Sequence, residues 1–168
     1  VPYMWIFPDI TIQAGDYLVV FASDKDRKDI PANYNTIIDW GNEWKYRFVE
    51  SQPPADWNGI GFDDSGWYEG PSGFGYGDGD DATVIDSART VYLRKTFDIT
   101  DALGITSAIL HMDYDDGFVA YINGTEIARA AMGEPGSPTY WDLFTDYGHE
   151  ALIYQGGNPE RFDIDLSG

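Results

Sequence analysis

The residue types and spacing best suited to chemistry occur in one glycine-rich stretch, GPSGFGYGDGDDATV, between Gly70 and Val84. Its three closely spaced aspartates are Asp78, Asp80 and Asp81. Carboxylate oxygens placed this close together on glycine-rich backbone can surround a calcium ion, which prefers hard oxygen ligands. The alternative is that these side chains accept hydrogen bonds from the amides of a turn. The stretch therefore predicts a calcium site at the three aspartates, with a purely structural turn as the competing interpretation.

Established phosphate and calcium motifs do not fit the same stretch. A P-loop needs a lysine followed by serine or threonine after its glycines, and no lysine directly follows them here. An EF-hand needs a glutamate at its twelfth position, which is missing in this register. Calcium-binding β-helix repeats must recur in tandem, whereas this stretch occurs once. The glycines are therefore expected to serve a long connection between strands.

No arrangement of residues favours catalysis. Adjacent carboxylates such as Asp115 and Asp116 point to opposite faces of a strand, so they cannot act as a pair on one glycosidic bond. The chain has no Gly-x-Ser-x-Gly nucleophile motif and no cysteine. Its two histidines, His111 and His149, lack the spacing of a zinc site. We therefore predict that the protein is not an enzyme.

Aromatic side chains in or beside loops give the remaining functional signal. Sugar rings stack their C–H faces on aromatic rings, while nearby polar side chains hydrogen-bond the hydroxyl groups. The alternative is that the same rings cover the core. The predicted carbohydrate-binding residues are Trp57, Tyr76 and Trp141 as aromatic contacts and Asp115, Asp116 and Arg129 as polar contacts.

Composition favours a β-rich protein and excludes nucleic-acid binding. The 168 residues carry a formal net charge of −19, and a phosphate backbone must be met by Lys and Arg. Anionic membrane surfaces are disfavoured for the same reason, and no apolar run approaches the ~20 residues needed to span a bilayer. Aromatic residues make up 16% of the chain, which contains 19 glycines and 9 prolines. Aromatic residues favour strands, and glycine and proline favour turns, so an all-β fold is expected.

Alternating apolar residues predict the strands of an antiparallel β-sandwich with long loops at its ends. Asn123-Gly124 between two apolar runs predicts a hairpin, because both central positions of a type I′ turn need positive φ. The segment between residues 132 and 159 is predicted to be irregular, with at most a short helical turn near residues 140–147. The predicted strands are residues 17–22, 36–40, 44–49, 90–97 and 107–114, the hairpin 117–129, and a strand beginning at residue 161.

Several segments, in this order, resemble a known module. They include FDDSGW, GPSGFGYGDGDD, YLRKTFDI and DDGFVAYINGTEIAR, between about Ile37 and Leu166. Together they resemble the galactose-binding-like jelly roll found beside catalytic and lamin-tail domains in large secreted bacterial proteins. The earlier segment WIFPDITIQAGDYLVVFASDKDR resembles the closing strands of a lamin-tail domain. The resemblance implies a lamin-tail-like C-terminal remnant and linker at residues 1–30, and a galactose-binding-like β-sandwich, truncated at its C-terminus, at residues 36–168.

The resemblance also implies a function and a location. The expected function is a non-catalytic carbohydrate-binding or adhesion module of a multidomain bacterial protein that is secreted or displayed at the cell surface. The alternatives are a structural spacer without a sugar ligand and an accessory domain of a glycoside hydrolase. The expected partners are a polysaccharide or glycan and the neighbouring domains. A further strand usually follows the FDIDLSG segment in such modules, and its absence would leave a sheet edge open to a homodimer or strand exchange.

Overall fold

The structure is a computed structural model, and it describes residues 34–48, 51–77, 79, 81–85 and 88–167. The chain divides into two units, Val1–Asn35 and Thr36–Gly168, and nearly all described residues belong to the second. The lamin-tail-like segment at residues 1–30, including its predicted strand at 17–22, lies outside the described residues. The following account therefore concerns the second unit.

Strands are the main regular structure of the described residues. Two single 3₁₀ turns are present, at Ala102–Gly104 and Ile153–Gln155, and the described residues contain no α-helix. The all-β prediction is confirmed. The strands are β1 (Glu43–Phe48), β2 (Tyr68–Pro71), β3 (Phe74–Gly75), β4 (Thr83–Val84), β5 (Val91–Arg94), β6 (Ala108–Met112), β7 (Phe118–Ile122), β8 (Thr125–Ala130) and β9 (Glu160–Ile164).

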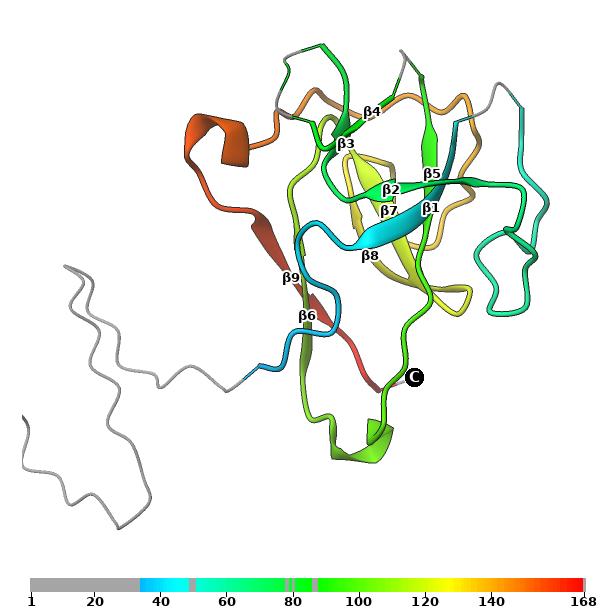
Figure 1. Cartoon of the computed structure of the whole chain (residues 1–168), viewed down its shortest axis with the longest axis vertical. Helices are drawn as coiled ribbons and strands as arrows, with labels where there is room; N and C mark the ends of the chain where they lie inside the picture. The colour runs from blue at the N-terminus through cyan, green and yellow to red at the C-terminus, as the bar shows by residue number, and fades with distance from the viewer. Residues whose placement is uncertain (1–33, 49–50, 78, 80, 86–87, 168) are drawn as a thin grey trace, which may run out of the picture. The chain divides into compact units, whose positions relative to one another are not determined.

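The strands form small sheets in which antiparallel pairing dominates (Figure 1). One sheet has the order β2-β1-β5, and β6 pairs with β9 while β7 pairs with β8, all antiparallel. The short β3 and β4 form a parallel pair that closes the glycine-rich stretch. This arrangement is consistent with the predicted β-sandwich.

The Asn123-Gly124 hairpin forms as predicted. Asn123 has φ 50° and Gly124 has φ 84°, the two positive values that a type I′ turn requires. The turn joins β7 to β8, with Ile122 opposite Thr125. This tight turn fixes which side chains of the two strands face the same way, and Tyr121 and Glu126 lie opposite each other as a result.

One prediction of local structure was wrong. Residues 36–40 are irregular rather than a strand, because Asn42 and Asp39 close a polar turn through two hydrogen bonds, with Gly41 at φ 74°. The segment 132–159 is irregular as predicted, but residues 140–147 contain only a turn, closed by the Leu143 amide on the Tyr140 carbonyl. The helical turn lies later, at Ile153–Gln155.

Aromatic rings form the packed interior. The most buried apolar residues have exposed fractions of only 3–8%, and they include Trp67 and Tyr92. Trp57 stacks on Trp67 at 6.4 Å between ring centroids and meets Tyr92 of β5 and Tyr121 of β7 edge-on, at 4.9 and 5.8 Å. The Trp57 side chain therefore bridges the three-stranded sheet and the β7–β8 hairpin.

Arg94 of β5 holds the loop that carries this tryptophan. Its guanidinium lies 2.8 Å from the Asp64 carboxylate and donates to the backbone carbonyls of Trp57 and Gly59. It also lies 5.1 Å from the centroid of the Phe62 ring, a cation–π distance. The Arg94 side chain is 12% exposed, so solvent replaces little of this network.

Replacing Arg94 with methionine should lower the free energy of unfolding by about 3 kcal/mol, because one carboxylate and two carbonyls lose a charged donor. The matched control is Lys45→Met. Lys45 lies directly opposite Arg94 on β1 and pairs with Glu69 at 2.9 Å, but both partners are more exposed. Its loss should cost under about 1 kcal/mol. Urea unfolding measures both values, and equal costs would contradict the anchoring role of Arg94.

Candidate functional site

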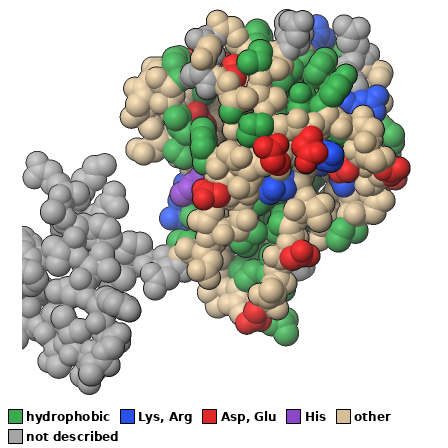
Figure 2. Space-filling view, viewed as in Figure 1, with side chains coloured by type: hydrophobic (Ala, Val, Ile, Leu, Met, Phe, Trp, Pro, Cys, Tyr) green, Lys and Arg blue, Asp and Glu red, His purple; other side chains and the backbone are tan. Residues whose placement is uncertain are grey.

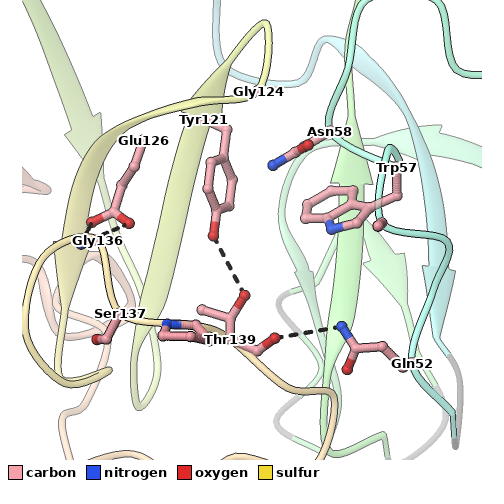
Figure 3. A pocket seen from close by; sticks show the side chains of 11 residues that line it. Gln52, Trp57, Asn58, Tyr121, Gly124, Glu126, Gly136, Ser137 and Thr139 are labelled. Carbon is pink, nitrogen blue, oxygen red and sulfur yellow. Dashed lines mark hydrogen bonds between the residues drawn. The ribbon is translucent and has the colours of Figure 1, made fainter.

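A pocket of about 430 Å³ lies between the loop before Asn58, the β7–β8 hairpin and the segment around Ser137 (Figure 3). This volume is within the range of small-ligand sites. Aromatic, amide, hydroxyl and carboxylate side chains share its walls. The lining residues are Gln52, Ala55, Trp57, Asn58, Tyr121, Gly124, Glu126, Gly136, Ser137, Pro138 and Thr139.

Two aromatic rings, of Trp57 and Tyr121, line the pocket. Trp57 is half-buried, and among the described residues its indole Nε1 has no hydrogen-bond partner. In Figure 3 this nitrogen lies on the side of the ring toward Gln52 and Thr139. The Tyr121 hydroxyl lies 3.4 Å from the Thr139 hydroxyl. An amphipathic wall of this kind offers ring surface and an N–H donor to the same ligand.

Asn58 adds a second polar group without a partner among the described residues. Its carboxamide forms no hydrogen bond there, and Figure 3 shows it in the space between the Trp57 and Tyr121 rings. The side-chain oxygen would be 3.8 Å from a Cβ added at Gly124, so the loop lies close to the hairpin turn. A carboxamide is both donor and acceptor, which suits a ligand hydroxyl.

A network around Arg129 fixes the opposite wall. Arg129 binds both oxygens of Glu126, at 3.0 and 2.8 Å, and both the hydroxyl and the carbonyl of Ser137, at 3.2 and 2.7 Å. The Gly136 amide donates to Glu126 at 3.3 Å. Hydrogen bonding by Arg129 is the largest cause that lowers the pKa of Glu126, so this carboxylate stays ionised. The Arg129 side chain is only 3% exposed.

Gln52 ties two segments together at the base of the pocket. Its side-chain oxygen accepts a hydrogen bond from the Trp141 amide at 3.0 Å, and its nitrogen donates to the Thr139 carbonyl at 3.4 Å. Both contacts cross more than eighty residues of sequence. Trp141 therefore supports the pocket through its backbone.

The structure divides the six predicted carbohydrate-binding residues into two groups. Trp57 lines the pocket, Arg129 lies behind its wall, and Trp141 supports its base. Tyr76 is 60% exposed within the glycine-rich stretch, and Asp115 and Asp116 are exposed in the connection after β6; none of the three lines the pocket.

Sequence reasoning missed most of the lining. Asn58 had a local signal, since it follows Trp57 directly in the predicted loop. Tyr121 and Glu126 occupy the hairpin that the sequence predicts, but nothing local indicates which face of the hairpin meets a loop. Thr139 and Ser137 lie in a segment without regular structure, where the sequence has no periodic pattern that would indicate which way a side chain points.

A second polar cluster surrounds His149. Its ring stacks on the Tyr114 ring at 4.0 Å, with Nδ1 3.0 Å from the Tyr114 carbonyl and Nε2 3.1 Å from the Glu160 carboxylate. Both nitrogens face acceptors, which favours the doubly protonated ring, and the Glu160 hydrogen bond is the largest cause that raises the pKa of His149. Asp116 accepts the His149 amide at 3.2 Å, so this predicted residue anchors the following loop.

Tyr114 completes that cluster. Its hydroxyl donates to the second oxygen of Glu160 at 3.0 Å. Burial raises the pKa of Tyr114 to about 12, and this hydrogen bond is the second-largest cause of the shift. Hydrogen bonding from His149, followed by that from Tyr114, lowers the pKa of Glu160. The cluster is satisfied internally and holds the loop before β9 against the end of β6.

Of the predicted calcium ligands, Asp78 and Asp80 lie outside the described residues. The Asp81 carboxylate packs against Gly75, where an added Cβ would lie 2.2 Å from its oxygen. No group of three carboxylates or histidines able to hold a metal ion occurs among the residues that the structure describes. The calcium site stays a prediction.

Acidic side chains are distributed over the visible surface. Figure 2 shows them in several separate groups, with hydrophobic side chains exposed between them. The structure contains, within its described residues, no helix of the length and apolar character needed to cross a bilayer.

Comparison with known proteins found no match to this chain among family models, curated proteins or solved structures. Function must therefore be inferred from the pocket and from the sequence pattern.

The His149–Glu160 pair predicts a pH window of stability. The pKa of His149 is raised above 6.5 in the folded protein. Its contribution to the free energy of unfolding is therefore complete below pH 6.5 and is lost as the pH rises through the raised value. Because the pKa of Glu160 is lowered below 4.5, its contribution is present above pH 4.5 and is lost as the pH falls through the lowered value. NMR titration of the His149 ring should show a lower pKa in Glu160→Gln than in the wild type. Identical titrations would contradict the pairing.

Calcium binding is tested by thermal unfolding. If Asp78, Asp80 and Asp81 bind calcium, the ion at one hundred times its Kd should stabilise the protein by about 3 kcal/mol relative to EDTA. Asp81→Asn should reduce this difference, whereas Asp98→Asn, at an exposed aspartate outside the glycine-rich stretch, should leave it unchanged. Identical melting temperatures in calcium and EDTA would contradict the predicted calcium site.

Proposed function

We propose that the protein is a non-catalytic carbohydrate-binding module whose ligand occupies the pocket beside Trp57. One observation carries the proposal: the Trp57 indole N–H and the Asn58 carboxamide face the same pocket without a protein partner among the described residues. Exposed polar groups of this kind are satisfied by water until a ligand replaces it. The Tyr121 ring beside them supplies apolar surface.

The chemistry of the walls suits a sugar. A pyranose ring has apolar C–H faces and a rim of hydroxyl groups, so it needs aromatic surface and polar groups together. Trp57 and Tyr121 supply the first, and Asn58, Glu126 and Thr139 supply the second. The Arg129 and Gln52 networks hold these walls in place before a ligand arrives, which reduces the ordering cost of binding.

The pocket also supports a binding role rather than hydrolysis. Glycoside hydrolysis generally needs two carboxyl groups across the scissile bond, one of them with a raised pKa. Among the lining residues that the structure describes, Glu126 is the one carboxylate, and its pKa is lowered by Arg129. A sugar can therefore be held here by hydrogen bonds and ring contacts without an acid–base pair.

The wider setting follows from the sequence resemblance. The order of motifs resembles the galactose-binding-like jelly roll of large secreted bacterial proteins, and we extend the proposal to that topology, to a secreted or cell-surface location and to a polysaccharide partner. In such a protein the module would hold neighbouring domains close to their substrate. Raising the local concentration of those domains is the physical benefit of a linked binding module.

Replacing Asn58 with alanine should weaken glycan binding about tenfold, because one or two hydrogen bonds to the ligand are lost. Trp57→Phe should weaken it similarly, since the variant keeps an aromatic ring and loses the N–H donor. A glycan array identifies ligands of the wild-type protein, and calorimetry then compares the variants.

The matched control is Tyr76→Ala, which removes an exposed aromatic ring that does not line the pocket. It should leave affinity unchanged. Loss of binding in this control with full binding by Asn58→Ala would move the site to the glycine-rich stretch. A folded protein that binds no glycan on a broad array would leave the structural spacer as the function.

A further inference from the structure

We propose that Glu126 is a specificity-determining residue that makes this pocket select uncharged sugars and reject sugars that carry a carboxylate. The inference rests on the carbohydrate-binding function proposed above, and it names the class of sugar. It follows from the way Glu126 engages the nearest cation, Arg129.

Arg129 has no donor left for a ligand. A guanidinium group has five N–H donors. In Arg129 two reach the Glu126 carboxylate, two reach the hydroxyl and carbonyl of Ser137, and one reaches the Met132 carbonyl. The side chain is 3% exposed, so it cannot turn toward the pocket without breaking this network. A cation that would otherwise pair with an acidic sugar is therefore fully engaged.

The face that the network presents to the pocket is a carboxylate. Glu126 lines the pocket, and the described lining residues include no lysine, arginine or histidine. A carboxylate group on a sugar would lose its hydration and meet another negative charge, without a free cation to compensate. The formal net charge of −19 on the chain adds a long-range repulsion of the same sign.

A neutral hydroxyl group meets the opposite situation. An ionised carboxylate offers about four lone-pair sites. On Glu126 three N–H groups occupy these sites, two from Arg129 and one shared contact from Gly136. The Gly136 contact is long, at 3.3 Å to each oxygen, and divided between the two, so a sugar hydroxyl can compete with it as a donor to Glu126. The same group that repels a carboxylate therefore binds an uncharged sugar.

The test compares matched sugar pairs that differ only at C6. NMR titration measures Kd for the methyl β-glycosides of glucose, galactose and mannose and for their 6-carboxylate counterparts. The wild type should bind the neutral member at least about tenfold more tightly in every pair that it recognises. Glu126→Gln, which keeps the shape and frees Arg129 from its charged partner, should reduce that ratio about tenfold. Glu134→Gln should leave it within about twofold, because it removes the same charge from an exposed side chain of the adjoining loop.

The outcomes separate this inference from the function on which it rests. If the wild type binds both members of a pair equally, or if Glu126→Gln and Glu134→Gln change the ratio equally, Glu126 does not set specificity although the pocket binds sugar. If the folded wild type binds no member of any pair, the carbohydrate function and this inference both fail. Thermal unfolding checks that Glu126→Gln is folded. If it is not, the inference is judged on the wild-type preference for the neutral sugar over its 6-carboxylate counterpart, and equal binding of the two overturns it.

Discussion

The pocket depends on one partly buried cation, Arg94, whose guanidinium holds the loop that carries Trp57. From a single position on β5 it binds a carboxylate and two backbone carbonyls of the loop between Trp57 and Asp64. That loop has no regular structure of its own, so its course is set by these hydrogen bonds and by the rings packed on it. Because the Trp57 carbonyl is one of the acceptors, the strand fixes the backbone from which the indole ring extends. The rest of the site is arranged around that ring.

Trp57 serves the fold and the pocket together. It stacks on Trp67 and meets Tyr92 and Tyr121 edge-on, which joins two sheets, yet it remains half-buried and keeps its N–H directed to the pocket. Binding sites gain precision when their side chains are held by packing on regular elements. Here the packing that buries one part of the indole also orients the part that a ligand would contact. The core and ligand-binding interpretations of this residue are therefore complementary.

Local sequence patterns predicted the strands better than the site. The Asn123-Gly124 turn and the strand at Val91–Arg94 were predictable, because backbone sterics and alternation act over a few residues. The strand predicted at residues 36–40 does not form, since a polar turn between Asp39 and Asn42 takes the place of the extended structure that their apolar residues favour. The pocket could not be predicted, because it depends on tertiary contacts: Gln52 reaches Thr139 across 87 residues of sequence, and Tyr121 reaches Thr139 across 18. Arg129 was identified as a polar candidate, but sequence could not show that Glu126 and Ser137 already engage it.

Under the proposed function, a strongly acidic chain holds a pocket for neutral ligands, and the charges at the wall of that pocket are paired. The pairing of Glu126 with Arg129 converts two opposite charges into a rigid group whose net charge is zero. The pair is still oriented, because its carboxylate faces the pocket and its guanidinium lies behind the pocket wall. Buried ion pairs contribute less to stability than to specificity in some systems, since desolvation offsets much of their attraction. Under the proposed function, the orientation of the Glu126–Arg129 pair matters more than its stabilising energy for what the pocket accepts.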